Sequence, residues 1–156
     1  MGYDVEISHA ADQFDEDPKP IPRDSWIEFM QSDPDWELDA DVAHGEEADA
    51  FALSRTIYDG EERLGLRWTS GLIYAKTPNE ELVNEMCRIA TIFGARVMGE
   101  EGEFYRSASD TYYVDDDGSE ATREDMYPQR RPDVTETRPD NKGLGRLFAP
   151  FLKLFR

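Results

Sequence analysis

The stretch AFALSRTIYDGEERLGLRWTSGLIYAKTPNEELVNEMCRIATIFG, residues 50–94, decides the fold class. Its first part holds three short runs, residues 50–58, 64–68 and 72–75, which are rich in β-branched, aromatic and alternating apolar residues. The first run stops at Asp59-Gly60, a dipeptide typical of tight turns between strands. The runs therefore predict three strands of an antiparallel meander.

The second part of the stretch predicts a helix. Thr77 can cap its N-terminus, Pro78 suits its first position, and the two glutamates that follow favour the positive end of the helix dipole. Gly94 is typical of the residue just after a helix. The apolar face of this helix consists of Leu82, Met86, Ile89, Ala90 and Phe93. Such a face needs a partner to pack against, and the meander supplies one.

The sequence on both sides extends this pattern. Residues 3–7 alternate as in a half-buried strand, and residues 22–32 have the apolar spacing of a short amphipathic helix. Residues 95–98 and 103–105 predict two more strands, and residues 111–114 are a further candidate. The order β-α-β-β-β-α-β-β predicts an α+β fold, a mainly antiparallel sheet with two helices on one face.

Three regions of different composition divide the chain. The α+β domain is expected to cover residues 1–114. Residues 115–142 are acidic, rich in Pro, Arg and Thr and nearly free of aliphatic residues, which predicts a mobile linker. Residues 143–156, GLGRLFAPFLKLFR, form a basic and strongly apolar tail.

The tail has the pattern of an amphipathic docking element. One helical stripe contains Leu144, Leu147, Phe148, Phe151, Leu152 and Phe155. Pro150 interrupts it, so two short helical turns compete with one bent helix. Three alternatives remain for the surface that this stripe packs against: the chain's own domain, a partner protein or second copy of the chain, and a membrane surface.

Charge narrows the classes of partner. The chain has 35 acidic and 17 basic residues, and a formal net charge of −18. This disfavours nucleic acid as a ligand, because phosphate backbones require a basic face. It favours a basic protein, although plain solubility is the simpler interpretation.

Other features point to the cytoplasm. The single cysteine, Cys87, excludes an internal disulfide and fits a reducing compartment. No secretory signal is expected in residues 1–20, and no apolar run approaches the length of a membrane span.

No motif predicts catalysis, a cofactor or a metal site. Residues 113–124 match part of a calcium-binding loop, but Tyr113 occupies the first ligand position, so a solvated acidic turn is favoured. His9 and His44 lack zinc-ligand spacing. Cys87 lies beside the apolar face of its helix and is expected to be a packing residue.

The acidic segment of residues 33–49 is the predicted contact surface for a basic partner. Trp36 is its central aromatic residue and is surrounded by charges, a pattern typical of an interface anchor. The alternative is that Trp36 attaches the segment to the core. The predicted partner-binding residues are Asp33, Asp35, Trp36, Asp39, Asp41, Glu46 and Glu47.

The stretches MGYDVEI, SWIEFMQSDPDWEL and NEELVNEMCRIATIFGARVMGEEGEFY resemble small acidic bacterial proteins of the kind that includes cytosolic immunity proteins of toxin systems. The resemblance covers residues 1–106 and transfers no functional residue. It implies stoichiometric, non-enzymatic inhibition of a basic toxin, such as a nuclease. The alternative function is an adaptor or membrane-peripheral protein that docks through its tail.

Overall fold

The computed structural model describes residues 2–39 and 48–128 of the chain. Within these residues it contains nine strands and three helices. The strands are β1 (Asp4–Ser8), β2 (Trp36–Leu38), β3 (Ala50–Asp59), β4 (Glu62–Thr69), β5 (Leu72–Lys76), β6 (Arg96–Gly99), β7 (Phe104–Ser107), β8 (Asp110–Val114) and β9 (Glu120–Ala121). The helices are α1 (Arg23–Ser32), α2 (Glu80–Phe93) and α3 (Arg123–Met126).

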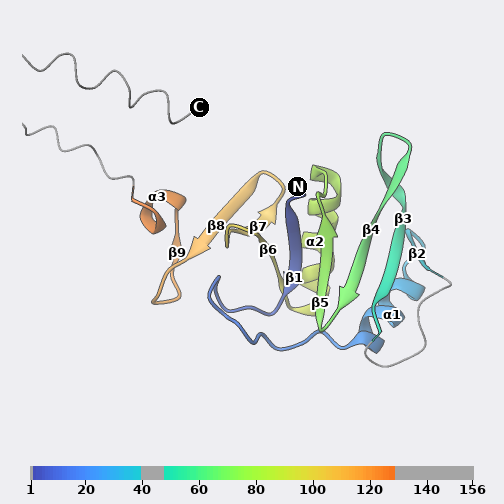
Figure 1. Cartoon of the computed structure of the whole chain (residues 1–156), viewed down its shortest axis with the longest axis horizontal. Coiled ribbons are helices and arrows are strands. Elements are labelled where there is room, and N and C mark those ends of the chain that lie inside the picture. The colour runs from blue at the N-terminus through green and yellow to red at the C-terminus, as the bar shows by residue number, and fades with distance from the viewer. Residues whose placement is uncertain (1, 40–47, 129–156) are drawn as a thin grey trace, which may run out of the picture.

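The strands form one sheet in the order β2-β3-β4-β5-β1-β6-β7-β8-β9 (Figure 1). Each neighbouring pair is antiparallel. β1 lies between β5 and β6, with Val5 opposite Ala75 on one side and Gly99 on the other. Since β5 and β6 both run against β1, they are parallel to each other, and α2 makes the crossover between them.

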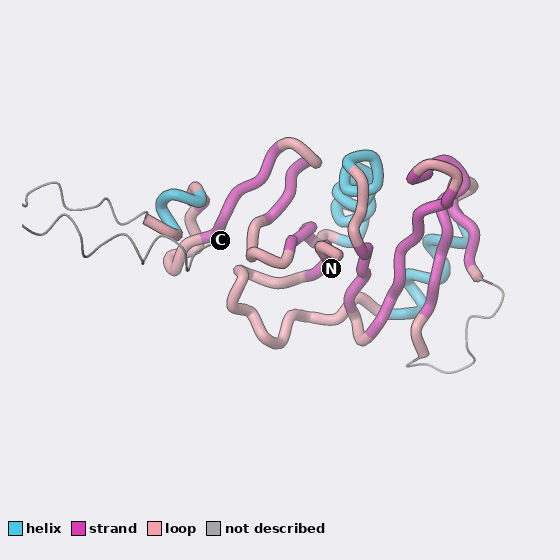
Figure 2. Tube along the Cα trace, turned by 45° about the horizontal axis from the view of Figure 1, so that its top comes forward, coloured by secondary structure: helices cyan, strands magenta, loops and turns pink. Residues whose placement is uncertain are grey.

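Both longer helices pack on one face of the sheet (Figures 1 and 2). They meet through Phe29 and Phe93, whose ring centroids are 5.6 Å apart in an edge-to-face contact. The core between helices and sheet includes Val5, Ile7, Trp26, Met30, Leu66, Ile73, Leu82, Met86, Ile89 and Val97. The opposite side of the sheet, which neither α1 nor α2 covers, is called the open face below.

Helix α2 begins and ends at residues that satisfy its free backbone groups. Asn79 is the N-cap, and its Oδ1 accepts a hydrogen bond of 2.9 Å from the Leu82 amide. Gly94 ends the helix with φ 63°, in the left-handed region where glycine avoids a Cβ clash. The cap therefore lies two residues after Thr77, the expected capping residue, which itself has φ 47°.

The predicted α+β class and mainly antiparallel sheet are confirmed, and three elements lie outside the predicted set. β2 lies in the acidic segment that carries few structural signals, and pairs with β3 from Trp36 opposite Ser54 to Leu38 opposite Ala52. β9 and α3 lie in residues 120–126, within the predicted linker. Residues 129–142 of that linker and the whole tail lie outside the described residues.

Candidate functional site

Acidic side chains gather around β2 at one margin of the described sheet. Asp35, Glu37 and Asp39 are exposed along this margin, and α2 brings two further glutamates to it. We call this surface the acidic edge; it comprises Asp33, Asp35, Glu37, Asp39, Glu81 and Glu85. Its strand is short, so its position depends on the contacts that hold it.

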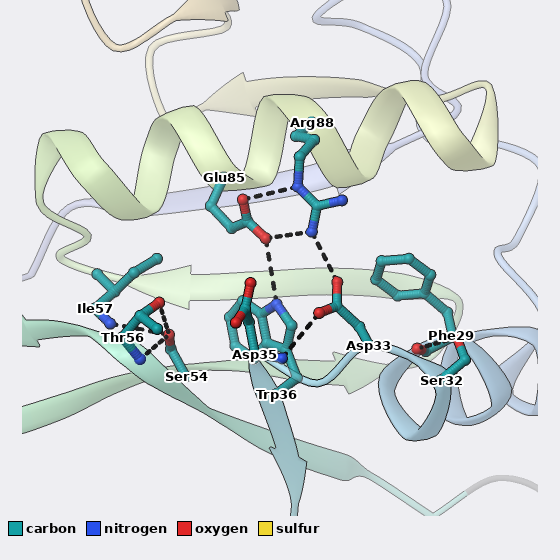
Figure 3. A network of polar contacts seen from close by, with 10 residues as sticks. All are labelled: Phe29, Ser32, Asp33, Asp35, Trp36, Ser54, Thr56, Ile57, Glu85 and Arg88. Atoms are coloured by element: carbon teal, nitrogen blue, oxygen red, sulfur yellow. Dashed lines mark hydrogen bonds and ion pairs between the residues drawn. The ribbon is translucent and has the colours of Figure 1, made fainter.

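Asp33 fixes the turn that leads from α1 into β2 (Figure 3). Its backbone amide donates to the Phe29 carbonyl at 3.0 Å and so ends the helix. Its Oδ1 accepts from the Asp35 amide at 3.0 Å, and its Oδ2 accepts from Arg88 at 2.8 Å. Both carboxylate oxygens of Asp33 are thus used in local hydrogen bonds. Asp35, two residues later, exposes its carboxylate to solvent.

Trp36 is buried under the edge, with 3% of its surface exposed. Its indole Nε1–H donates to Oε1 of Glu85 at 3.3 Å, and its backbone amide donates to the Asp33 carbonyl at 3.2 Å. This position fits the interpretation in which Trp36 attaches the acidic segment to the core. The exposed acids beside it in the chain are Asp35, Glu37 and Asp39.

Arg88 on α2 joins the two sides of the edge. Its guanidinium donates to Glu85 from Nε at 2.9 Å and from NH2 at 2.5 Å, and NH2 also reaches Asp33 (Figure 3). The hydrogen bonds to Glu85, with those to Asp33, raise the pKa of the Arg88 guanidinium despite partial burial. The loop before β2 is therefore tied to α2 through a charged bridge.

Sequence reasoning missed Glu81 and Glu85 of α2, and it also missed exposed Glu37 of β2. Oε2 of Glu37 accepts from Arg63 of β4 at 3.1 Å and lies 3.8 Å from Arg55 of β3. No pattern in the local sequence marks this contact, because it depends on the pairing of β2 with β3. The Glu85–Arg88 pair did have a signal, since residues three apart on a helix are neighbours.

A small hollow of about 240 Å³ lies between the acidic edge and α2. Asp35, Glu81 and Glu85 line it together with polar residues of β3. There the Ser54 hydroxyl accepts from the backbone amides of Thr56 at 3.2 Å and Ile57 at 3.0 Å. The hollow suits a basic side chain from a partner, because its charged lining residues are mainly acids.

Several predicted site residues lie outside the described part of the chain. Asp41, Glu46 and Glu47 of the acidic segment are among them. So are the tail residues Leu144, Leu147, Phe148, Phe151, Leu152 and Phe155. The tail as a docking element, and with it the adaptor alternative, stays a prediction.

The partial calcium motif forms a turn between β8 and β9. Asp115 Oδ1 accepts from the backbone amides of Asp117 at 3.1 Å and Ser119 at 2.9 Å, and Gly118 adopts φ 83°. Tyr113 is buried in β8. Among residues 2–39 and 48–128, no group of three His, Cys, Asp or Glu side chains is placed to hold a metal ion.

Cys87 packs against the core from α2. Its thiol donates to the Tyr105 carbonyl, with Sγ 3.7 Å from the oxygen, and burial raises its pKa to about 11. A thiol held in its protonated form is a poor nucleophile. The position of Cys87 thus favours the packing role over a catalytic one.

None of the helices in the described residues has the length and apolar character to cross a membrane. Comparison with known proteins finds no matching family model, no matching curated protein and no matching solved structure. Function must therefore be argued from the geometry of the chain alone.

Proposed function

We propose that the protein is a non-enzymatic binding protein that holds a basic protein partner at its acidic edge. The observation that carries this proposal is that exposed Asp35, Glu37 and Asp39 lie on or directly beside β2, the strand that buried Trp36 anchors. A surface held in place before binding loses little conformational freedom when the partner arrives. The excess of negative charge along it also accelerates association with an oppositely charged surface.

The partner that suits this surface best is a basic toxin, and a nuclease is the leading class. Nucleases are basic where they hold nucleic acid, so an acidic protein is steered toward the site that it must block. The net charge of −18 supports the same choice. Under this proposal the protein acts as an immunity protein in the cytoplasm, through a one-to-one complex.

Paired charge-reversal variants test the acidic edge. The test variant is Asp35→Lys/Glu81→Lys, which changes two exposed acids that line the hollow. The matched control is Glu16→Lys/Glu61→Lys, which alters net charge equally at exposed positions outside the edge. Basic proteins captured from source-cell lysate by the wild type are purified, and their affinity for all three proteins is measured by calorimetry.

The proposal expects one basic protein to bind the wild type with one-to-one stoichiometry and to lose its nuclease activity in the complex. The test variant should bind it at least about tenfold more weakly, whereas the control should retain most of the affinity. If both variants bound the partner equally weakly, the loss of affinity would be an effect of net charge alone. That result would reject the acidic edge as the binding site. Undiminished nuclease activity in the complex would reject the inhibitor function.

A further inference from the structure

The open face carries a different kind of surface from the acidic edge. The strand registers place one row of side chains across seven neighbouring strands, from β3 to β8. These residues are Phe51, Arg67, Tyr74, Glu6, Met98, Phe104 and Tyr112. Because directly opposed residues share a face, this row lies on the side away from buried Val5 and Ile7.

The loop between β1 and α1, residues 9–22, contacts the β6–β7 end of the row, because the Ala10 and Ala11 carbonyls accept from Arg96 and Gln13 lies against Gly102. Arg96 of β6 stacks over Phe104, with its guanidinium carbon 4.1 Å from the ring centroid, and donates to the Ala10 carbonyl at 2.7 Å. Phe104 is consequently only 1% exposed. The other end, over β3, β4, β5 and β1, has no such cover among the described residues.

A pocket of about 530 Å³ occupies this uncovered end. Gly65 lies in it on β4, and a Cβ built there would meet the Phe51 ring at 2.9 Å and the Ala52 carbonyl at 2.6 Å. The glycine thus lets the Phe51 ring lie close over the backbone. Tyr74 forms part of the lining, so two aromatic side chains border a space of the size that small ligands use.

Two unpaired cations belong to the same pocket. Arg67 lies opposite both Phe51 and Tyr74, and Lys76 follows two residues after Tyr74 on β5. Neither side chain has a hydrogen bond or ion pair with any described residue, although the chain carries 35 acids. Arginines such as Arg63 and Arg88, in contrast, are paired. Arg67 and Lys76 therefore offer donors to an anionic group.

An unsatisfied acceptor completes the pocket. Asp4 lies opposite Lys76 in β1, and its Oδ1 is buried without a hydrogen-bond partner. Asp4 also lines the pocket, and its carboxylate supplies the negative charge that pairs with an ammonium group. Glu62 and Arg63 also line the pocket. Its lining therefore has three basic side chains and two acidic ones, namely Arg63, Arg67, Lys76, Asp4 and Glu62. This balance suits a ligand with both charges better than a polyanion.

We propose that this pocket binds a free aromatic amino acid. The carboxylate is held by Arg67 and Lys76, the ammonium by Asp4, and the ring packs against Phe51 and Tyr74. The strands that carry Arg67 and Asp4 are two inter-strand spacings apart, about 10 Å. The long side chain of Arg67 brings its guanidinium closer to the Asp4 carboxylate, so that one amino acid can contact both groups. The site lies on the opposite face from α1 and α2. None of its proposed ligand contacts belongs to the acidic edge, although Arg63 of its lining pairs with Glu37 of that edge.

Calorimetry with L-phenylalanine, L-tyrosine and L-tryptophan tests the pocket on the full chain. At least one of them should give saturable one-to-one binding. For the best ligand of the three, the analogue without the amine and the analogue without the carboxylate should bind at least about tenfold more weakly. L-leucine should also bind more weakly, because it lacks the ring.

Variants locate the site. Arg67→Gln and Asp4→Asn should each weaken binding at least about tenfold, while the control Lys19→Gln, at an exposed cation outside the pocket, should not. Thermal unfolding checks that each variant is folded. Absence of saturable binding at concentrations on the order of 10 mM would overturn the proposal, as would full affinity in Arg67→Gln. Equal binding of the amine-free analogue would overturn the assignment of an amino acid.

Discussion

Glu6 illustrates how a single residue takes its chemistry from its position in the sheet. It lies on the open face of β1, and burial raises the pKa of its carboxyl above the ordinary value of 4.5. The Tyr74 hydroxyl donates to the carboxyl and opposes part of this rise. Because the folded protein binds this proton more tightly than the unfolded chain, the stability from this group is present below the ordinary pKa. It is lost as pH rises through the folded pKa.

Glu6→Gln is expected to stabilise the protein at pH 7, because the amide keeps an acceptor for Tyr74 without a buried charge. The gain should shrink as pH is lowered toward 4, where the wild-type carboxyl takes up its proton. Thermal unfolding of wild type and variant between pH 4 and pH 8 measures this difference. Glu16→Gln, at an exposed position, is the control for net charge. A gain that is equal at both ends of the pH range would contradict the prediction.

Helix α2 is the element on which both the fold and the acidic edge depend. It buries Leu82, Met86 and Ile89 against the sheet and presents Glu85 and Arg88 to the turn before β2. Its termination at Gly94 is a matter of local backbone conformation, since a Cβ there would meet no atom within 4 Å apart from those of its own stretch of backbone. A substitution at this glycine therefore isolates the energy of the left-handed conformation.

Gly94→Ala is expected to reduce the free energy of unfolding by about 1–2 kcal/mol, the cost of the left-handed conformation for a residue with a Cβ. Chemical denaturation with urea measures the loss. Gly94→Asn should cost less, because asparagine tolerates this conformation better. Equal stability of the alanine variant and the wild type would indicate that the helix ends at a different residue in solution.

The elements with strong local patterns were predictable, and those that depend on distant partners were not. Apolar periodicity and turn residues predict the three meander strands, the helices α1 and α2, and the strands β1, β6 and β7. β2 does not, because three residues among acids become a strand only by pairing with β3. For α3 a signal existed: Thr122 and Asp125 form a capping box, a spacing that is visible in sequence.

The acidic edge was predictable in composition but not in architecture. Its aspartates are obvious in the sequence, and their exposure follows from charge. The burial of Trp36, the bridge by Arg88 and the position of Glu37 all depend on residues 26 to 55 positions away in the chain. The open-face pocket depends likewise on four strands brought together by the sheet.

At the scale of the whole molecule, the excess of acidic residues determines how the fold responds to salt. A net charge of −18 on one small protein produces repulsion that favours the unfolded chain, where the charges are farther apart. Several described acids are paired, but the excess leaves most of them without a cation. Dissolved cations can screen this repulsion.

Raising the sodium chloride concentration from about 20 mM to about 500 mM is expected to increase the thermal unfolding midpoint, because the screening length falls below about 10 Å in this range. Differential scanning fluorimetry measures the shift. The variant Glu16→Lys/Glu61→Lys has four fewer net negative charges and should gain less from the added salt. A midpoint that falls with salt would show that the ion pairs outweigh the general repulsion.

The central place of β1 has a consequence for the order in which the chain acquires its structure during synthesis. A ribosome makes β1 before every other strand, yet its two neighbours, β5 and β6, follow about 70 and 90 residues later. The strands from β2 to β5 can pair with one another as they emerge, because each lies beside the next in the sheet. The β1 segment of the nascent chain must therefore remain unpaired at least until β5 has been made. The two halves of the sheet become joined only when β1 is inserted between them.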